Sequence, residues 1–195
     1  MKKILLLSFL FIGQFTFAQD DYSFERVTEV IEEGPNYSQG TIVSLVPEIV
    51  LEFEGTLEDG YKYAKEYVLK NYNTPDEVIK AEIENDYFRF QGASNGLVFV
   101  TLGKRDIYYD SARFMIVINF REGRFKFEVQ SLEHYSSINY EWYDVGLRWK
   151  VKNRKGKINP SSLENLSNVE NYFINQAKTI QDYINKKGVV EDDDW

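Results

Sequence analysis

The chain has 195 residues, no cysteine, one histidine, 14 Phe, 14 Tyr and 3 Trp, and its net charge is −8. This composition excludes a disulfide scaffold, and it excludes zinc and copper sites of ordinary composition, which need several Cys or His ligands. A strongly acidic chain is repelled by phosphate backbones, so we expect no nucleic-acid partner.

The N-terminus has the pattern of a signal peptide, which we assign to residues 1–18. Two lysines precede a short apolar run at residues 4–12, and Ala18 offers a small residue for cleavage before Gln19. A membrane-spanning helix needs about 20 mainly apolar residues, and Gln14 interrupts this run. We therefore expect an exported protein, periplasmic or secreted, with no transmembrane segment after cleavage. The mature chain keeps 21 basic and 31 acidic residues, a net charge of −10.

Three regions follow the expected cleavage site. Residues 19–48 contain several turn-forming residues and no sustained periodicity, so we expect an irregular extension with at most a short strand between Phe24 and Ile31. Residues 49–188 form a single α+β domain in this interpretation. Residues 189–195 form a short acidic tail.

The domain begins with a strand and an amphipathic helix. Apolar and polar residues alternate from Ile49 to Phe53, as in a strand with one buried face. Thr56 to Asp59 resembles a capping box, which satisfies free backbone N–H groups at a helix start. Beyond it, apolar residues recur every three or four positions and form one helical stripe: Leu57, Tyr61, Ala64, Val68 and Tyr72.

Four or five alternating strands come next, and a second long helix closes the pattern. Short connections and one-sided alternation between residues 77 and 131 are typical of an antiparallel sheet with one wet face. A helix begins at Asn159-Pro160 and is expected to stop at Gly188. The sequence thus predicts an antiparallel sheet of five to seven strands with two amphipathic helices packed on one face. We expect these residues to share the core: Phe114, Ile116, Ile118, Phe120, Phe125, Phe127, Val68, Phe173 and Ile180.

One segment resembles a known family. Gly55 to Tyr67 reads Gly-Thr-Leu-Glu-Asp-Gly-Tyr-Lys-Tyr-Ala-Lys-Glu-Tyr, and the strand at Val78-Ile79-Lys80 and the Gly92 region follow it. These residues resemble an exported Bacteroidota family of unknown function with a TATA-binding-protein-like fold, β-α-β-β-β-β-α. The resemblance covers residues 49–132 and the last helix. It implies a fold but no catalytic residues, since a fold by itself does not specify function.

No catalytic constellation stands out in the sequence. His134 has no evident nucleophile or orienting partner, so we expect a surface or loop residue rather than a general base. Carboxylates two residues apart, such as Glu52 and Glu54, are typical of a solvated strand face. A glycosidase would instead need two carboxyls facing each other across a cleft. We expect no enzyme activity, no metal site and no cofactor.

Residues 133–158 are an insertion that is rich in aromatic and basic residues. Ile138, Tyr140 and Trp142 alternate as in one more packed strand, and the same aromatic rings could instead contact a ligand. Residues 148–157 then carry six positive charges and no acid, which indicates either an anion-binding patch or a solvated loop. The candidate binding residues are Trp142, Trp149, Arg148, Lys150, Lys152, Arg154, Lys155 and Lys157.

We therefore expect a non-enzymatic periplasmic or secreted binding module whose ligand the sequence does not identify. The expected partner is an anionic envelope component or another envelope protein. Two alternatives stay open: an envelope structural or assembly protein, and a hydrolase that works through carboxylates. A large exposed apolar patch would favour assembly, and a polar pocket with two convergent acids would favour the hydrolase.

Overall fold

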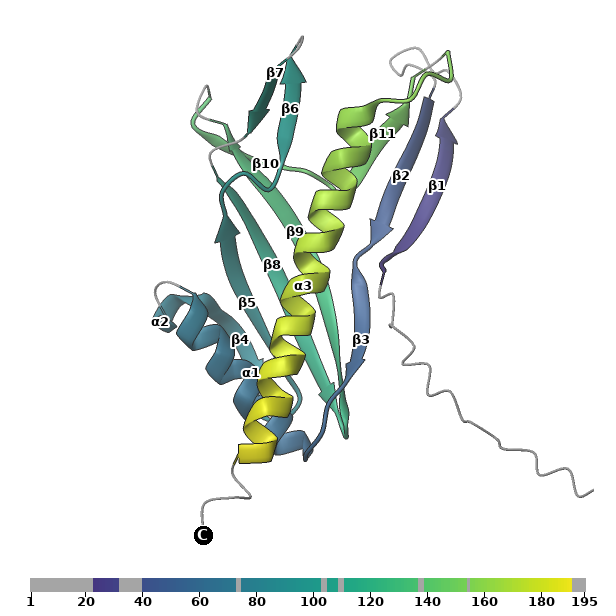
Figure 1. The fold of residues 1–195 in the computed structure, drawn as a ribbon. Coiled ribbons are helices and arrows are strands. Elements are labelled where there is room, and N and C mark those ends of the chain that lie inside the picture. The colour runs from purple at the N-terminus through teal and green to yellow at the C-terminus, as the bar shows by residue number, and fades with distance from the viewer. Residues whose placement is uncertain are drawn as a thin grey trace, which may run out of the picture.

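The computed structural model describes most of the chain after the expected signal peptide, and two helices lie along one face of a long, twisted sheet (Figure 1). The described residues are 23–31, 40–72, 75–102, 105–108, 111–136, 139–153 and 155–190. The expected signal peptide and residues 191–195 of the expected acidic tail lie outside these residues. None of the described helices is both long and apolar enough to span a bilayer.

The main sheet has six antiparallel strands. Its strand order is β10-β9-β8-β5-β4, and β3 also pairs with β9. These strands are β3 (Glu48–Glu52), β4 (Ile79–Ile83), β5 (Tyr87–Ser94), β8 (Ala112–Arg121), β9 (Arg124–Ser136) and β10 (Glu141–Asp144). A tight turn joins β8 to β9, and Gly123 has a φ of 67°, which glycine adopts without the steric cost that a Cβ atom adds. The predicted antiparallel sheet is confirmed.

A second sheet is formed by residues from both ends of the domain. Its order is β1-β2-β11, with β1 at Glu25–Ile31, β2 at Gly40–Val46 and β11 at Arg148–Lys152. The prediction of an irregular extension is therefore wrong for these residues, although β1 matches the short strand expected near Phe24. The reason is long-range pairing: β2 hydrogen-bonds to β11, which lies about 100 residues later in the chain.

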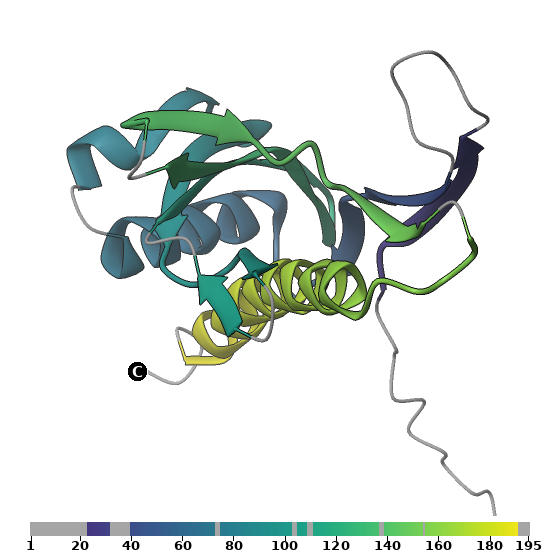
Figure 2. The same ribbon diagram turned by 90° about the horizontal axis from the view of Figure 1, so that it is seen from above.

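Two long helices cover one face of the main sheet, as predicted (Figure 2). They are α1 (Leu57–Asn71) and α3 (Pro160–Val190), and a single turn, α2 (Pro75–Val78), precedes β4. The Thr56 side chain accepts from the Asp59 amide and the Asp59 carboxylate accepts from the Thr56 amide, so the capping box is confirmed. The expected stop at Gly188 is wrong, because α3 continues through it to Val190. A short ribbon is formed by β6 (Phe99–Leu102) and β7 (Arg105–Tyr108).

The core lies between the main sheet and the two helices. All nine predicted core residues are buried there, each at most 2% exposed. Their aromatic rings meet edge-on or tilted, for example Phe114 with Phe173 at 5.1 Å between centroids. Tyr63 is also buried, although it lies outside the apolar stripe that the sequence predicts for α1.

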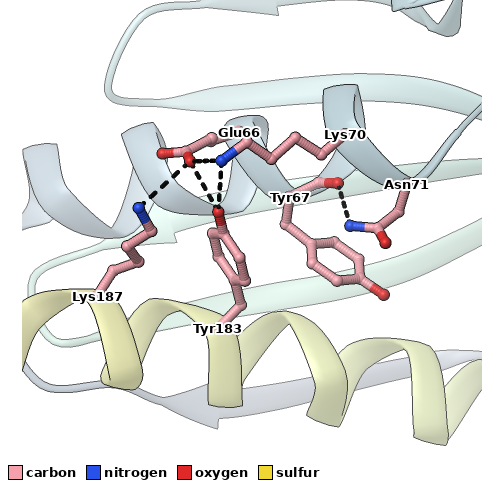
Figure 3. A network of polar contacts seen from close by, with 6 residues as sticks. All are labelled: Glu66, Tyr67, Lys70, Asn71, Tyr183 and Lys187. Atoms are coloured by element: carbon pink, nitrogen blue, oxygen red, sulfur yellow. Dashed lines mark hydrogen bonds and ion pairs between the residues drawn. The ribbon is translucent and has the colours of Figure 1, made fainter.

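A polar network joins α1 to α3 at the surface of the core (Figure 3). The Glu66 carboxylate accepts hydrogen bonds from Lys70 and from the Tyr183 hydroxyl, the latter at 2.7 Å, and Lys187 Nζ lies 3.5 Å away. These partners lower the pKa of Glu66 to about 2, chiefly through the hydrogen bond from Lys70.

Candidate functional site

The predicted basic stretch lies on the second sheet and on the loop that follows it. On β11, Arg148 forms an ion pair with Glu29 of β1 at 2.8 Å, and Lys150 is half-buried beside β2. Lys152, Lys155 and Lys157 are exposed, whereas Arg154 lies outside the described residues. The stretch is therefore a partly neutralised strand edge followed by a solvated turn.

The two candidate tryptophans lie in different environments. Trp149 is 7% exposed and belongs to the core cluster, and its strand β11 contacts α3. Trp142 is half-buried on β10 of the main sheet. The structure therefore does not bring the two rings together in one binding surface. The packed strand expected from Ile138 is also only partly correct: β10 starts at Glu141, Tyr140 lies 78% exposed in the preceding turn, and Ile138 is outside the described residues.

Trp142 faces the side of the main sheet that the helices leave uncovered, which we call the open face. Its cross-strand partner is Tyr135, and their ring centroids are 5.3 Å apart. The guanidinium of Arg113 lies 4.4 Å from the Trp142 ring centroid and pairs with Glu133. The two rings are tilted by 55° to each other. Together with the guanidinium they form a group that we call the aromatic shelf, and this combination suits contact with a partner that is partly apolar and partly charged.

The open face consists of the strand positions that alternate with core residues. On β9, for example, Phe125 and Phe127 point toward the helices, so Arg124, Lys126 and Glu128 point away from them. A hollow of about 640 Å³ lies on this face. It is lined by Val50 of β3, Val117, Asn119 and Arg121 of β8, and Arg124, Phe125, Lys126, Glu128 and Gln130 of β9.

Three arginines on the open face have no acidic partner within the described part of the chain. Lys126 is neutralised by Glu128 at 3.0 Å and by Glu48 at 3.3 Å. In contrast, the side chains of Arg89, Arg121 and Arg124 form no ion pair or hydrogen bond with a described residue, and the Nε atom of Arg89 is buried without an acceptor. A guanidinium binds carboxylate and phosphate groups through paired hydrogen bonds, so these side chains are available for an anion.

The sequence pattern assigns Arg89 and Lys126 to the solvent-exposed face of their strands. It does not show which of the two side chains has an acidic partner. Which arginine lacks an acid depends on strand register, for example on the pairing of Arg121 with Arg124 across the β8–β9 turn. The nearest acid to Arg124 in the register is Glu52 on β3, and the two form no ion pair. This register joins segments distant in sequence and has no local signature.

His134 is a packed side chain. Its ring stacks on Tyr143 with centroids 5.6 Å apart, and burial lowers its pKa, so the neutral form is favoured. Among the described residues, no group of three His, Cys, Asp or Glu side chains is arranged to hold a metal ion.

The comparisons with known proteins concern the fold. No protein-family model matches the chain, and no curated protein matches its sequence significantly. Among solved structures, it is similar to a DUF4468 family protein from Bacteroides ovatus ATCC 8483, with a TM-score of 0.55 and 12% identity over 80% of this chain and 90% of that one. A TBP-like protein from Parabacteroides distasonis ATCC 8503 has a TM-score of 0.47 and 13% identity, over 70% and 90% of the two chains. The chain is thus similar in structure to a Bacteroides protein of the DUF4468 family, and the α+β fold that the sequence resemblance predicted is confirmed.

Proposed function

We propose that this protein is an exported, non-enzymatic binding module whose contact surface is the open face and whose partner carries anionic groups. The observation that carries the proposal is the set of three arginines, Arg89, Arg121 and Arg124, that have no acidic partner among the described residues. At physiological ionic strength, charges more than about 8 Å apart are largely screened. The arginines can therefore attract an anionic partner locally even though the net charge of the chain is negative.

We expect the partner to carry repeated carboxylate or phosphate groups and to be large enough to reach the aromatic shelf as well. An acidic polysaccharide and an anionic lipid surface both meet this description. The Arg113–Trp142 stack would contact the apolar parts of either, such as sugar C–H groups or acyl chains.

The alternative of a hydrolase that works through carboxylates has less support. A glycosidase needs one carboxyl that holds a proton near neutral pH, which requires a raised pKa. Glu66 and Glu82 are instead held as carboxylates, because hydrogen bonds from Lys70 and Lys65, respectively, lower their pKa values.

Assembly through an apolar patch also has less support, because the exposed large apolar residues come from separate strands, loops and α3: Val27, Val50, Ile83, Tyr140, Tyr143, Ile158 and Leu163.

A pair of charge-matched variants tests the contact surface. The first, Arg121→Glu with Arg124→Glu, reverses two charges of the open face. The second, Lys155→Glu with Lys157→Glu, reverses two charges of the basic stretch and alters net charge equally. All four side chains are exposed, so both variants are expected to fold with nearly unchanged stability. Binding to oligogalacturonate and to phosphatidylglycerol vesicles is measured at low and at physiological salt.

We expect the open-face variant to lose more than tenfold in affinity for one of the two probes, while the basic-stretch variant keeps it. The probe that binds identifies the source of the anionic groups. The opposite pattern would place the contact surface on the basic stretch. If the unmodified protein binds neither probe at low salt, the anionic partner is refuted.

Export is a separate part of the proposal. We expect processing between Ala18 and Gln19, because the preceding residues have the basic, apolar and small-residue pattern of a signal peptide. The intact mass of the protein recovered from its native host decides this point. A mass that retains residues 4–12 would contradict it.

A further inference from the structure

A second hollow lies on the opposite, helix-covered side of the main sheet, where β4 stops short of the end of β5. The pairing of β4 with β5 extends only to Ile79 and Phe90, so β5 from Gln91 onward is an edge of the sheet. The end of α1, the turn α2 and the middle of α3 surround this edge and leave a cleft of about 530 Å³. Its lining residues are Tyr67, Asn71, Tyr72, Glu77, Val78, Lys80, Gln91, Gly92, Ala93, Tyr172 and Gln176. We call it the tyrosine cleft.

Neutral polar groups dominate the lining. Three tyrosines, which carry hydroxyls, and Asn71, Gln91 and Gln176, which carry amides, are among the lining residues. A hydroxyl and a side-chain amide can each both donate and accept a hydrogen bond, unlike an ammonium or a carboxylate. Burial raises the pKa values of Tyr67, Tyr72 and Tyr172, so these hydroxyls keep their protons near neutral pH. Glu77 and Lys80, the acid and base of the lining, are exposed and opposite in charge.

Packing beneath the cleft holds these groups in place. The Tyr72 hydroxyl donates to Gln176 Oε1 at 3.1 Å, and its ring contacts Phe90 at 5.2 Å between centroids. Gly92 allows this arrangement, because a Cβ atom there would lie 2.3 Å from the Phe114 ring and 2.6 Å from the Tyr72 ring. On the same turn of α1, the Asn71 amide donates to the Tyr67 carbonyl oxygen, as Figure 3 shows.

We propose that the tyrosine cleft binds a neutral saccharide of one or two rings. A sugar presents hydroxyls that both donate and accept, which match the lining, and C–H faces that pack on tyrosine rings. The cleft volume lies within the range of about 300–1,000 Å³ found for small-molecule sites. Among the described residues of the lining one is positive and one is negative, so these residues offer no net attraction to a charged ligand. This site is independent of the open face.

The test is a double variant that removes both partners of one hydrogen bond in the cleft lining. Tyr72→Phe with Gln176→Leu replaces both partners of one hydrogen bond by apolar groups of similar shape, a change that is often nearly neutral for folding. Tyr61→Phe is the matched control, because Tyr61 is a buried tyrosine of α1 that, like Tyr72, has a side-chain hydrogen bond, here to Glu82, and it lies outside the cleft. The probes are maltose, cellobiose, lactose and chitobiose at millimolar concentration, with saturation-transfer NMR of the sugar signals.

We expect at least one disaccharide to bind the unmodified protein and the Tyr61→Phe variant, and to bind the double variant at least tenfold more weakly. Thermal unfolding of each variant verifies that the cleft is folded. Equal binding by a folded double variant would place the saccharide elsewhere and overturn the proposal. Absence of binding by the unmodified protein to all four disaccharides would overturn it as well. If the double variant unfolds, the single variant Gln91→Ala, at a half-buried cleft position, takes its place with the same expected loss.

Discussion

Glu170 provides the sharpest test of how the N-terminal strand is held to the domain. This carboxylate lies on α3, is 4% exposed, accepts a hydrogen bond from the Phe24 amide at 3.1 Å and pairs with Arg26. Glu170→Leu would leave the buried Phe24 amide without an acceptor, which costs about 1–3 kcal/mol. The lost pair with the half-exposed Arg26 adds at most about 1 kcal/mol. We therefore expect a loss of about 1–4 kcal/mol in the free energy of unfolding.

Glu170→Gln separates the two contributions, because its amide oxygen can still accept from Phe24. We expect it to cost about 1 kcal/mol, as measured by urea unfolding followed by tryptophan fluorescence. Hydrogen exchange should show faster exchange of the Phe24 amide in Glu170→Leu than in Glu170→Gln. A loss below about 0.5 kcal/mol for Glu170→Leu, the range of surface substitutions, would refute the anchoring role. Equal losses in both variants would mean that the charge of Glu170, rather than its acceptor oxygen, holds β1.

Three further predictions concern the core and the junction of α1 with α3. Ile116→Ala removes a fully buried side chain and should cost about 2–5 kcal/mol in urea unfolding, whereas a loss near zero would contradict its burial. Glu66→Gln should lower stability by about 1 kcal/mol at pH 7. Because the folded-state pKa of Glu66 is depressed to about 2, this difference should shrink as pH falls from about 4.5 toward 2, and a pH-independent difference would contradict the network with Tyr183. Gly60→Ala should lower the melting temperature, because its Cβ would lie 2.2 Å from the Phe53 ring; an unchanged melting temperature would show that this ring moves freely.

Much of the fold could be predicted because its determinants are local. The capping box at Thr56 depends on a residue three positions away, and the alternation in β8 and β9 depends on the two-residue period of a strand. The same patterns identified which residues form the core. They did not reveal that Gly188 continues α3, since a glycine stop is a tendency that packing can override.

The candidate site was harder to predict because it depends on contacts between distant segments. Trp142 and Trp149 belong to the same aromatic and basic insertion in the sequence, yet Trp149 is buried in the core and Trp142 lies on the open face. Arg148 belongs to the most basic segment of the chain, yet Glu29 neutralises it, while Arg121 and Arg124, in ordinary strands, have no acidic partner among the described residues. Local charge density did not identify these cations.

The sequence by itself therefore determined the α+β class, the two amphipathic helices, and the solvent-exposed and buried faces of the strands. The tertiary structure alone decided the pairing of β2 with β11 and the convergence of three tyrosines at the edge of β5. It also decided the register that leaves three arginines of the open face without an acidic partner in the described part of the chain. The physical reason is that side-chain periodicity follows from the local backbone. Pairing and convergence follow from contacts between segments that are distant in the sequence and meet only when the chain folds.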